Sequence, residues 1–230
     1  MNSIAIIPAR GGSKRIPRKN IKPFVGIPII EYSIKAALES ELFSDVMVST
    51  DDPEIVEIAL KAGATVPFLR SGNTANDYAH IGDVLLEVLN TYNQNGKTFE
   101  TFCCILATAP FITSKRIHEG FTLLQTNDFD SVFPVLQFSY PIQRALKIED
   151  NKVSMIQPEF LLSRSQDLRP SYHDSGQFYW CNTNRFLETK KVFTENSGSI
   201  VLSEMEVQDI DSPEDWEIAE MKYKIIQLKK

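Results

Sequence analysis

Short runs of apolar and β-branched residues recur along the chain, and longer segments with helical spacing separate them. The runs cover residues 4–7, 46–49, 102–107 and 131–135. Continuous apolar runs of this length are typical of parallel strands that helices cover on both faces. Residues 30–38, 81–92 and 117–124 place apolar side chains three or four positions apart, which predicts helices with one apolar stripe facing a sheet.

Strands that alternate with helices predict an α/β fold, here a three-layer sandwich with a mostly parallel, Rossmann-like sheet. Ligands of such folds bind at the carboxyl ends of the strands. Residues 145–148 and 152–156 flank Glu149-Asp150-Asn151, which predicts a small inserted hairpin. We expect a single domain over residues 1–230, with an excursion at about 137–175 that serves dimerisation or ligand binding.

Composition narrows the class of protein. Hydrophobic residues make up 43% and charged residues 23% of the 230 positions, as in a globular chain with one sizeable core. The apolar runs are too short to span a bilayer, and the N-terminus lacks a secretory pattern. Cys103, Cys104 and Cys181 show no metal-ligand spacing, which favours buried thiols and a cytoplasmic location.

Positive charge is concentrated in one segment of an otherwise acidic chain. The net charge is −6, yet PARGGSKRIPRKN at residues 8–20 and the following Lys22 contain six cations and no acid. A strand-to-helix loop rich in glycine, lysine and arginine can bind a triphosphate, and Gly11 and Gly12 would permit close backbone approach. The Walker and dinucleotide-binding glycine patterns are both absent.

The basic loop has two other interpretations. A solvated charged loop is the more common meaning of a random basic run. A nucleic-acid surface would extend over a larger basic face with interleaved aromatic residues, but the loop has no aromatic residue before Phe24. We therefore expect no nucleic-acid partner and favour an anionic small molecule.

The loop IPARGGSKRIPRKNIKP resembles the signature loop of the CMP-sugar synthetases, the cytidylyltransferases that activate nonulosonic acids. The similarity continues through VSTDD at 48–52, FLRS at 68–71, LATAPF at 106–111 and QDIDSPEDW at 208–216. It therefore covers essentially the whole chain. Within that family, SYHDSGQFYW at 171–180 most resembles the pseudaminic acid cytidylyltransferases.

The resemblance implies a nucleotidyltransferase that couples CTP to the anomeric hydroxyl of a sugar acid and releases pyrophosphate. Arg10, Lys19 and Asn20 match the family loop and are expected to bind the nucleotide, with Lys19 and Arg10 in catalytic roles. Lys14 and Arg15 either guard the mouth of the site or face water. Arg70 matches the family arginine directed at the cytosine or its surroundings.

Asp209 and Asp211 alternate along an expected last strand, so both carboxylates should project to one face. Paired carboxylates suit Mg²⁺, and the family match supports a metal site with a catalytic part for Asp211. Asp211 alternatively favours the N-terminal dipole of the helix that begins with Ser212-Pro213. Asp52 is interpreted as an ordinary N-cap before Pro53.

A sugar acid brings a carboxylate, which arginine binds with a planar, two-pronged donor set. Arg144 and Arg164 are favoured over Arg169, although solvated or interfacial arginines are equally consistent with this segment. Gln177 and Tyr179 alternate with Phe178 and Trp180, so one pair is expected to face the substrate and the other the core. His173 beside Asp174 is left as a structural pair.

Two positions depart from the family pattern. Asp77-Tyr78-Ala79-His80 stands where the family often has small hydroxyl residues, and Leu106 replaces a glutamine of the sialic acid enzymes. The second departure argues against sialic acid.

The function expected is the synthesis of CMP-pseudaminic acid by a homodimer. The alternatives are a CMP-sialic or CMP-legionaminic acid synthetase, a sugar-1-phosphate nucleotidyltransferase, and a nucleotide-binding regulator without turnover.

Overall fold

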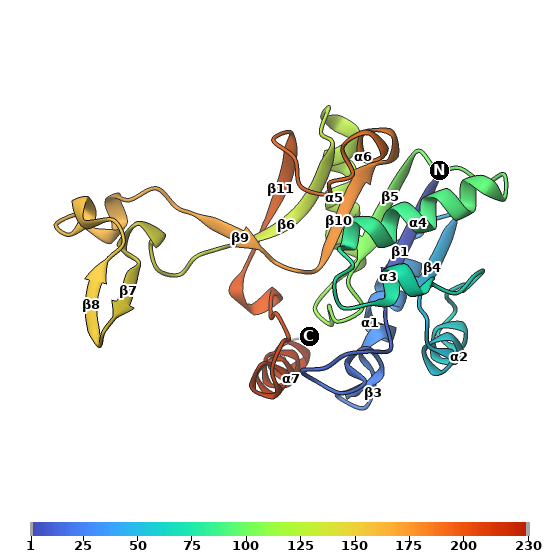
Figure 1. Cartoon of the computed structure of the whole chain (residues 1–230), viewed down its shortest axis with the longest axis horizontal. Helices are drawn as coiled ribbons and strands as arrows, with labels where there is room; N and C mark the ends of the chain where they lie inside the picture. Colours follow the sequence, from blue (N-terminus) through green and yellow to red (C-terminus); the bar gives the residue numbers. More distant parts are fainter. Residues whose placement is uncertain (1, 229–230) are drawn as a thin grey trace.

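The computed structural model describes residues 2–228 and contains one large twisted sheet with helices on both faces (Figure 1). The sheet has seven strands in the order β11-β6-β10-β5-β1-β4, and β9 pairs with β6 outside this path. The strands are β1 (Ser3–Pro8), β4 (Asp45–Ser49), β5 (Thr101–Ile105), β6 (Ser131–Gln137), β9 (Tyr172–Asp174), β10 (Phe178–Asn182) and β11 (Ser197–Leu202).

Five of the seven strands run in the same direction, and β9 and β10 run opposite to them. β1 runs parallel to β4 and β5, and β11 runs parallel to β6, whereas β10 is antiparallel to both strands that flank it. The predicted α/β fold with a mostly parallel sheet is therefore confirmed. Because β10 is reversed, its first residues lie beside the carboxyl end of β5.

The continuous apolar sequence of β1 is explained by helices on both sides of it. Ala5 and Ile7 pack in one cluster with side chains of α1 (Ile29–Glu39), α2 (Pro53–Lys61) and α5 (Ser114–Thr126). Ile4 and Ile6 pack on the other face with α4 (Ile81–Gln94) and α6 (Thr183–Thr189). All four side chains are fully buried, as expected for a central strand.

A third cluster holds the last helix, α7 (Pro213–Leu228), against the rest of the molecule. Trp216 packs edge-to-face on Phe24, which lies in the short ribbon of β2 (Pro23–Phe24) and β3 (Ile27–Pro28). Ser212 and Asp215 cap α7, since the Ser212 hydroxyl accepts from the Asp215 N–H and donates to the Asp215 carboxylate. The predicted start of this helix is confirmed.

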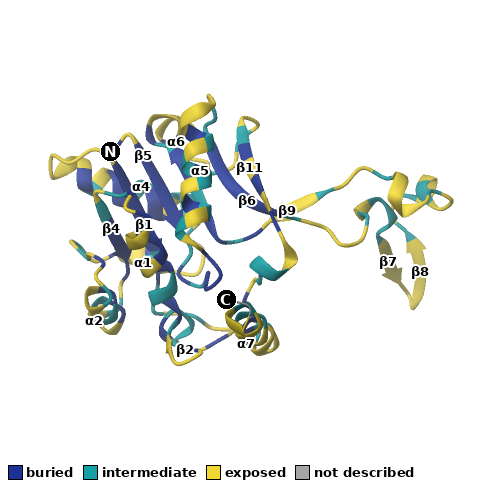
Figure 2. Ribbon diagram, turned by 180° about the vertical axis from the view of Figure 1, so that it is seen from behind, coloured by how far each residue is buried: buried dark blue, intermediate teal, exposed yellow. Residues whose placement is uncertain are grey.

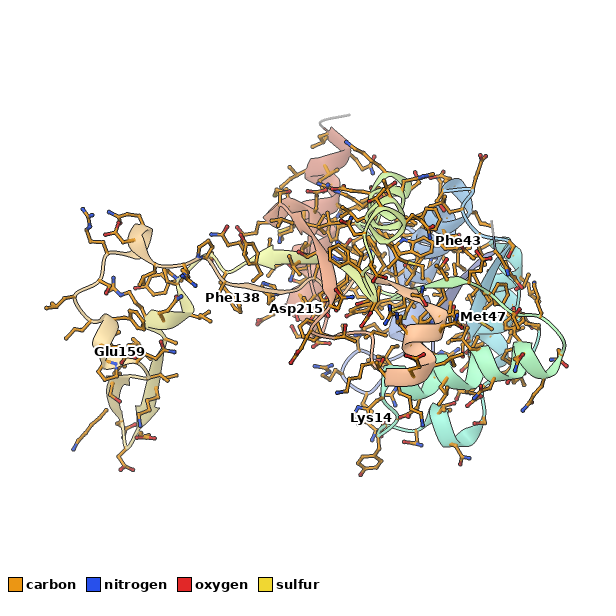
Figure 3. All side chains as sticks on the ribbon, turned by 90° about the horizontal axis from the view of Figure 1, so that it is seen from above. Lys14, Phe43, Met47, Phe138, Glu159 and Asp215 are labelled. Carbon is orange, nitrogen blue, oxygen red and sulfur yellow. The ribbon has the colours of Figure 1, made fainter. Side chains whose placement is uncertain are left out.

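Residues 138–171 form an arm that extends away from the sheet, with Phe138 at its base and Glu159 near its far end (Figure 3). The predicted hairpin is confirmed as β7 (Leu146–Glu149) and β8 (Lys152–Met155). Asp150 and Asn151 connect these strands with φ of 50° and 61°, as a tight hairpin turn requires. The remaining turns of the arm are the 3-10 helices η2 (Ile142–Arg144), η3 (Pro158–Phe160) and η4 (Ser165–Asp167).

The expectation of a last strand around Asp209 and Asp211 was wrong. The last strand is β11, and residues 207–211 connect the 3-10 helix η5 (Glu204–Glu206) to α7 without strand pairing. Val207 and Ile210 are buried, but they are three positions apart, so the segment is not buried on one face in the way that a strand would be. The two aspartates alternate in the sequence, but alternation of two residues is too short a pattern to predict a strand.

The three cysteines are free and buried, and burial raises the pKa of each thiol. None of the helices within residues 2–228 has the length and apolar character needed to cross a bilayer.

Candidate active site

A cavity of about 490 Å³ lies where β1 and β5 reach their carboxyl ends. Its walls come from the loop after β1, the segment after β5, and the stretch from Arg70 to the first turns of α4. This position is the usual ligand-binding edge of an open α/β sheet.

Four of the six cations in the opening loop line this cavity, namely Arg10, Lys14, Arg15 and Lys19. The other two serve the fold. Arg18 forms ion pairs with Asp52 and Glu54 at the start of α2, and the Lys22 ammonium lies 4.3 Å from the centre of the Trp216 ring. Asp52 also caps α2, in agreement with its structural interpretation.

Lys19 is held in place at the cavity wall. It begins the 3-10 helix η1 (Lys19–Ile21), and its Nζ donates to the Ile210 carbonyl at 2.7 Å and lies 3.5 Å from an Asp211 oxygen. Its side chain is only 18% exposed. An immobilised cation of this kind requires little reorganisation when charge develops beside it.

Asn20 and Gly11 shape the loop from within. Asn20 donates from its side chain to the Arg10 carbonyl at 2.9 Å and also lines the cavity. The Gly11 N–H donates to Asp51, and a Cβ on Gly11 would come within 2.5 Å of an Asp52 oxygen. Gly11 is therefore required by close packing against Asp52.

Asp209 and Asp211 lie in one short extended segment next to Lys19. Arg15 pairs with Asp211 at 2.7 Å. Partial desolvation and then the Asp211 charge raise the pKa of Asp209, while Lys19 opposes the rise. A carboxylate whose charge is disfavoured by burial and by a neighbouring carboxylate gains from a divalent cation, so the two together are a suitable donor set. Residues 2–228 hold no group of three or more potential metal-ligating side chains, so further ligands would have to come from substrate and water.

Arg70 lines the third wall of the cavity and is buried. Its Nε and one terminal nitrogen donate to Ser49, and burial lowers the pKa of its guanidinium. The next residues are fixed by Glu87 of α4, which accepts from the Ser71 N–H and from the hydroxyls of Ser71 and Thr74. These bonds hold α3 (Gly72–Ala75) against α4.

Gln177 and Tyr179 lie beside the carboxyl end of β5 but do not line the cavity. Gln177 is buried and donates to the Glu206 carbonyl at 2.5 Å, which ties η5 to the sheet. The Tyr179 hydroxyl donates to Asp174; burial and then the Asp174 charge raise the pKa of the phenol. Phe178 and Trp180 are fully buried, as predicted for the alternate pair.

Arg144 and Arg164 lie in the arm, which the views show extending away from the sheet (Figures 1 and 2). Arg144 donates weakly to the Ser163 carbonyl at 3.4 Å, and its buried Nε has no hydrogen-bond partner within residues 2–228. Arg164 pairs with Asp167 at 2.8 Å, and Arg169 receives a bond from Gln143 at its carbonyl. The predicted phosphate-loop residues thus converge, and the predicted sugar-carboxylate residues do not join them.

Sequence reasoning missed Asp77 as a site residue. Its carboxylate contacts both Arg10 and Lys14 and lines the cavity. The only sequence signal was an acidic residue where related chains often have hydroxyl residues, and no local pattern indicates which loop it contacts.

The arrangement is suited to phosphoryl chemistry. Several cations line one cavity, and Asp211, which does not itself line the cavity, lies against two of them, Arg15 and Lys19. Within residues 2–228, no cysteine or histidine lines this cavity. The site can therefore bind a polyphosphate and neutralise charge on it, while a second substrate supplies the attacking group.

Comparison with known proteins agrees with this chemistry. The model of the family described as cytidylyltransferase matches residues 4–224. A pseudaminic acid cytidylyltransferase of Campylobacter jejuni is 42% identical over 98% of this chain and 97% of its own length. A CMP-N,N'-diacetyllegionaminic acid synthase of Legionella pneumophila is 31% identical over 96% of this chain and 95% of its own length.

The fold has relatives at much lower identity. A CMP:2-keto-3-deoxy-manno-octonic acid synthetase solved in complex with CTP superposes with a TM-score of 0.69 and 15% identity, over 99% of each chain. That similarity concerns the fold, whereas the family match and the Campylobacter relative concern the sequence over nearly its full length. The chain belongs to the cytidylyltransferase family.

Proposed function

We propose that the chain transfers the cytidylyl group of CTP to the anomeric hydroxyl of pseudaminic acid, forming CMP-pseudaminic acid and pyrophosphate. The observation that carries this proposal is the convergence of four loop cations and Asp211 at the ligand-binding edge of a cytidylyltransferase sheet. The choice of sugar is supported by 42% identity to a pseudaminic acid enzyme, against 31% to a legionaminic acid enzyme.

In this reaction the sugar hydroxyl attacks the α-phosphorus of CTP, a new P–O bond forms, and the bond to the β-phosphate breaks. Lys19 would stabilise the charge that moves onto the departing pyrophosphate, and Arg10 and Lys14 would bind its oxygens. Asn20 would support the loop from which these cations project, and Arg70 would approach the base. The hydroxyl proton leaves to solvent or to a carboxylate at the site.

We further propose that Asp209 and Asp211 hold Mg²⁺. A bound Mg²⁺ supplies Lewis-acid neutralisation of phosphate oxygens, and it commonly uses one or two carboxylates with substrate oxygens and water. The raised pKa of Asp209, which comes from partial desolvation and then from the Asp211 charge, supports this role, because a bound cation would stabilise the charged form.

The function is tested by incubating the protein with CTP, Mg²⁺ and, separately, pseudaminic, legionaminic and sialic acid, followed by mass spectrometry. We expect CMP-pseudaminic acid and stoichiometric pyrophosphate. Turnover with legionaminic or sialic acid but none with pseudaminic acid would overturn the sugar assignment. CTP binding with no product from any acid would instead favour a regulator. The buried free thiols support a reducing, cytoplasmic location, which we include in the proposal.

We also propose that the chain works as a homodimer joined through the arm. Large apolar side chains of the arm are exposed, among them Ile148 at 74% and Leu162 at 94%. A monomer seldom leaves such a surface in water. A second copy would also bring Arg144 and Arg164 to a site that they cannot reach in their own chain, where they would bind the sugar carboxylate.

The double variant Ile148→Asp/Leu162→Asp is expected to halve the molar mass measured by light scattering, because two charges would enter an apolar contact. Leu60→Asp is the matched control, since Leu60 is an exposed leucine of α2 outside the arm. A dimeric double variant, or a monomeric unmodified protein at micromolar concentration, would contradict the proposed interface.

A further inference from the structure

Asp77 holds two cations of the phosphate-binding loop. Its Oδ1 accepts from the Arg10 guanidinium at 2.6 Å, and its Oδ2 pairs with the Lys14 ammonium. Hydrogen bonds from Lys14 and Arg10 keep the pKa of Asp77 below its usual value. The carboxylate is therefore charged at neutral pH, and it presents two oxygens where two basic side chains meet.

We propose that Asp77 is an internal competitor for the phosphates of the nucleotide: it holds Arg10 and Lys14 before CTP binds and returns to them as pyrophosphate leaves. This inference rests on the proposed function, in which these two cations bind the phosphates that become pyrophosphate. Asp77 thereby becomes a residue that limits the affinity for CTP and pyrophosphate and promotes release of the product.

The charges favour the ligand over Asp77, but only moderately. A triphosphate brings about four negative charges, whereas Asp77 brings one carboxylate. The ion pairs of Asp77 are partly exposed, with side-chain exposures of 34% for Arg10, 79% for Lys14 and 36% for Asp77. Exposed ion pairs contribute little to stability, so a polyphosphate can displace the Asp77 carboxylate from Arg10 and Lys14. An anion with a single charge would have no such advantage over Asp77.

The turn that carries Asp77 lies between two anchored ends. On one side, Glu87 fixes Ser71 and Thr74; on the other, the His80 N–H donates to Asp83 at the start of α4 at 3.1 Å. Between these points, Asp77 and Tyr78 are exposed, and the one hydrogen bond of Tyr78 within residues 2–228 is donated by its N–H to Asn76 in the same turn. Displacing Asp77 therefore breaks few buried contacts.

The test is calorimetric titration of pyrophosphate, CTP and cytidine into the unmodified protein and Asp77→Asn. The isosteric variant is expected to bind pyrophosphate and CTP about fivefold more tightly, with a gain that shrinks as salt is added. Cytidine has no phosphate, so its affinity should not change. Inhibition of turnover by pyrophosphate should strengthen by the same factor.

Two further variants control for charge and for folding. Asp77→Glu retains the carboxylate and should bind like the unmodified protein, and Glu57→Gln removes an exposed charge of α2 and should have no effect. Equal or weaker pyrophosphate binding by folded Asp77→Asn would overturn the role of Asp77 alone. Failure of both the unmodified protein and the variant to bind pyrophosphate would overturn the loop as a phosphate site, and this inference with it.

Discussion

Replacing Lys19 by methionine or alanine is expected to lower kcat by about 10²–10³-fold, with CTP binding much less affected. The Lys19 ammonium is fixed between the Ile210 carbonyl and Asp211 at the wall of the cavity. It can therefore stabilise charge on pyrophosphate without first being ordered. Pyrophosphate release at saturating CTP and sugar acid measures the effect.

The matched control for this experiment is Lys22→Ala, three positions along the same loop. Lys22 lies over the Trp216 ring and outside the cavity, so its loss should lower the melting temperature while kcat remains near that of the unmodified protein. A Lys19 variant that folds and turns over at a normal rate would remove Lys19 from the mechanism.

Asp211→Ala is expected to lower kcat/KM by about 10²–10³-fold at ordinary Mg²⁺ concentration, with partial recovery when Mg²⁺ is raised. The reason is that loss of one of two carboxylate ligands weakens the metal site, while the hydrogen bond from Lys19 to the Ile210 carbonyl remains. Removing Asp211 also leaves Arg15 without its 2.7 Å partner, which affects charge at the cavity but not the core. Initial rates across a Mg²⁺ titration measure this dependence.

Asp215→Asn separates the metal role from helix capping. The Asp215 carboxylate accepts from the Asp211 and Ser212 N–H groups and from the Ser212 hydroxyl. Its loss should cost about 1 kcal/mol of stability as for other caps, without raising the Mg²⁺ requirement. If Asp211→Ala behaved in the same way, Asp211 would be a capping residue and not a metal ligand.

Much of the architecture was predictable because it depends on local patterns. The apolar runs of β1, β4, β5 and β6 and the periodic stripes of α1, α4 and α5 lie where the sequence analysis expects them. Burial on one or both faces leaves a period in the sequence, and these periods differ between helices and strands. The same local logic identified the cap at Asp52 and the hairpin of the arm.

Errors arose where the pattern has more than one cause. Asp209 and Asp211 alternate as they would on one face of a strand, but their segment forms no strand pairing, and the last strand is β11. Gln177 was expected at the substrate, whereas a buried amide must satisfy its hydrogen bonds and does so at the Glu206 carbonyl.

The amino-acid order was sufficient for the class of fold, the basic loop after β1 and the family to which the chain belongs, because these are carried by contiguous residues. The division of that loop into cavity-lining cations and cations that stabilise α2 and Trp216 depended on folding. The contacts of Asp77 with Arg10 and Lys14, which are more than 60 residues away in the sequence, also depended on folding. Contacts between distant segments follow from packing of the whole chain, and packing has no local period from which it could be predicted.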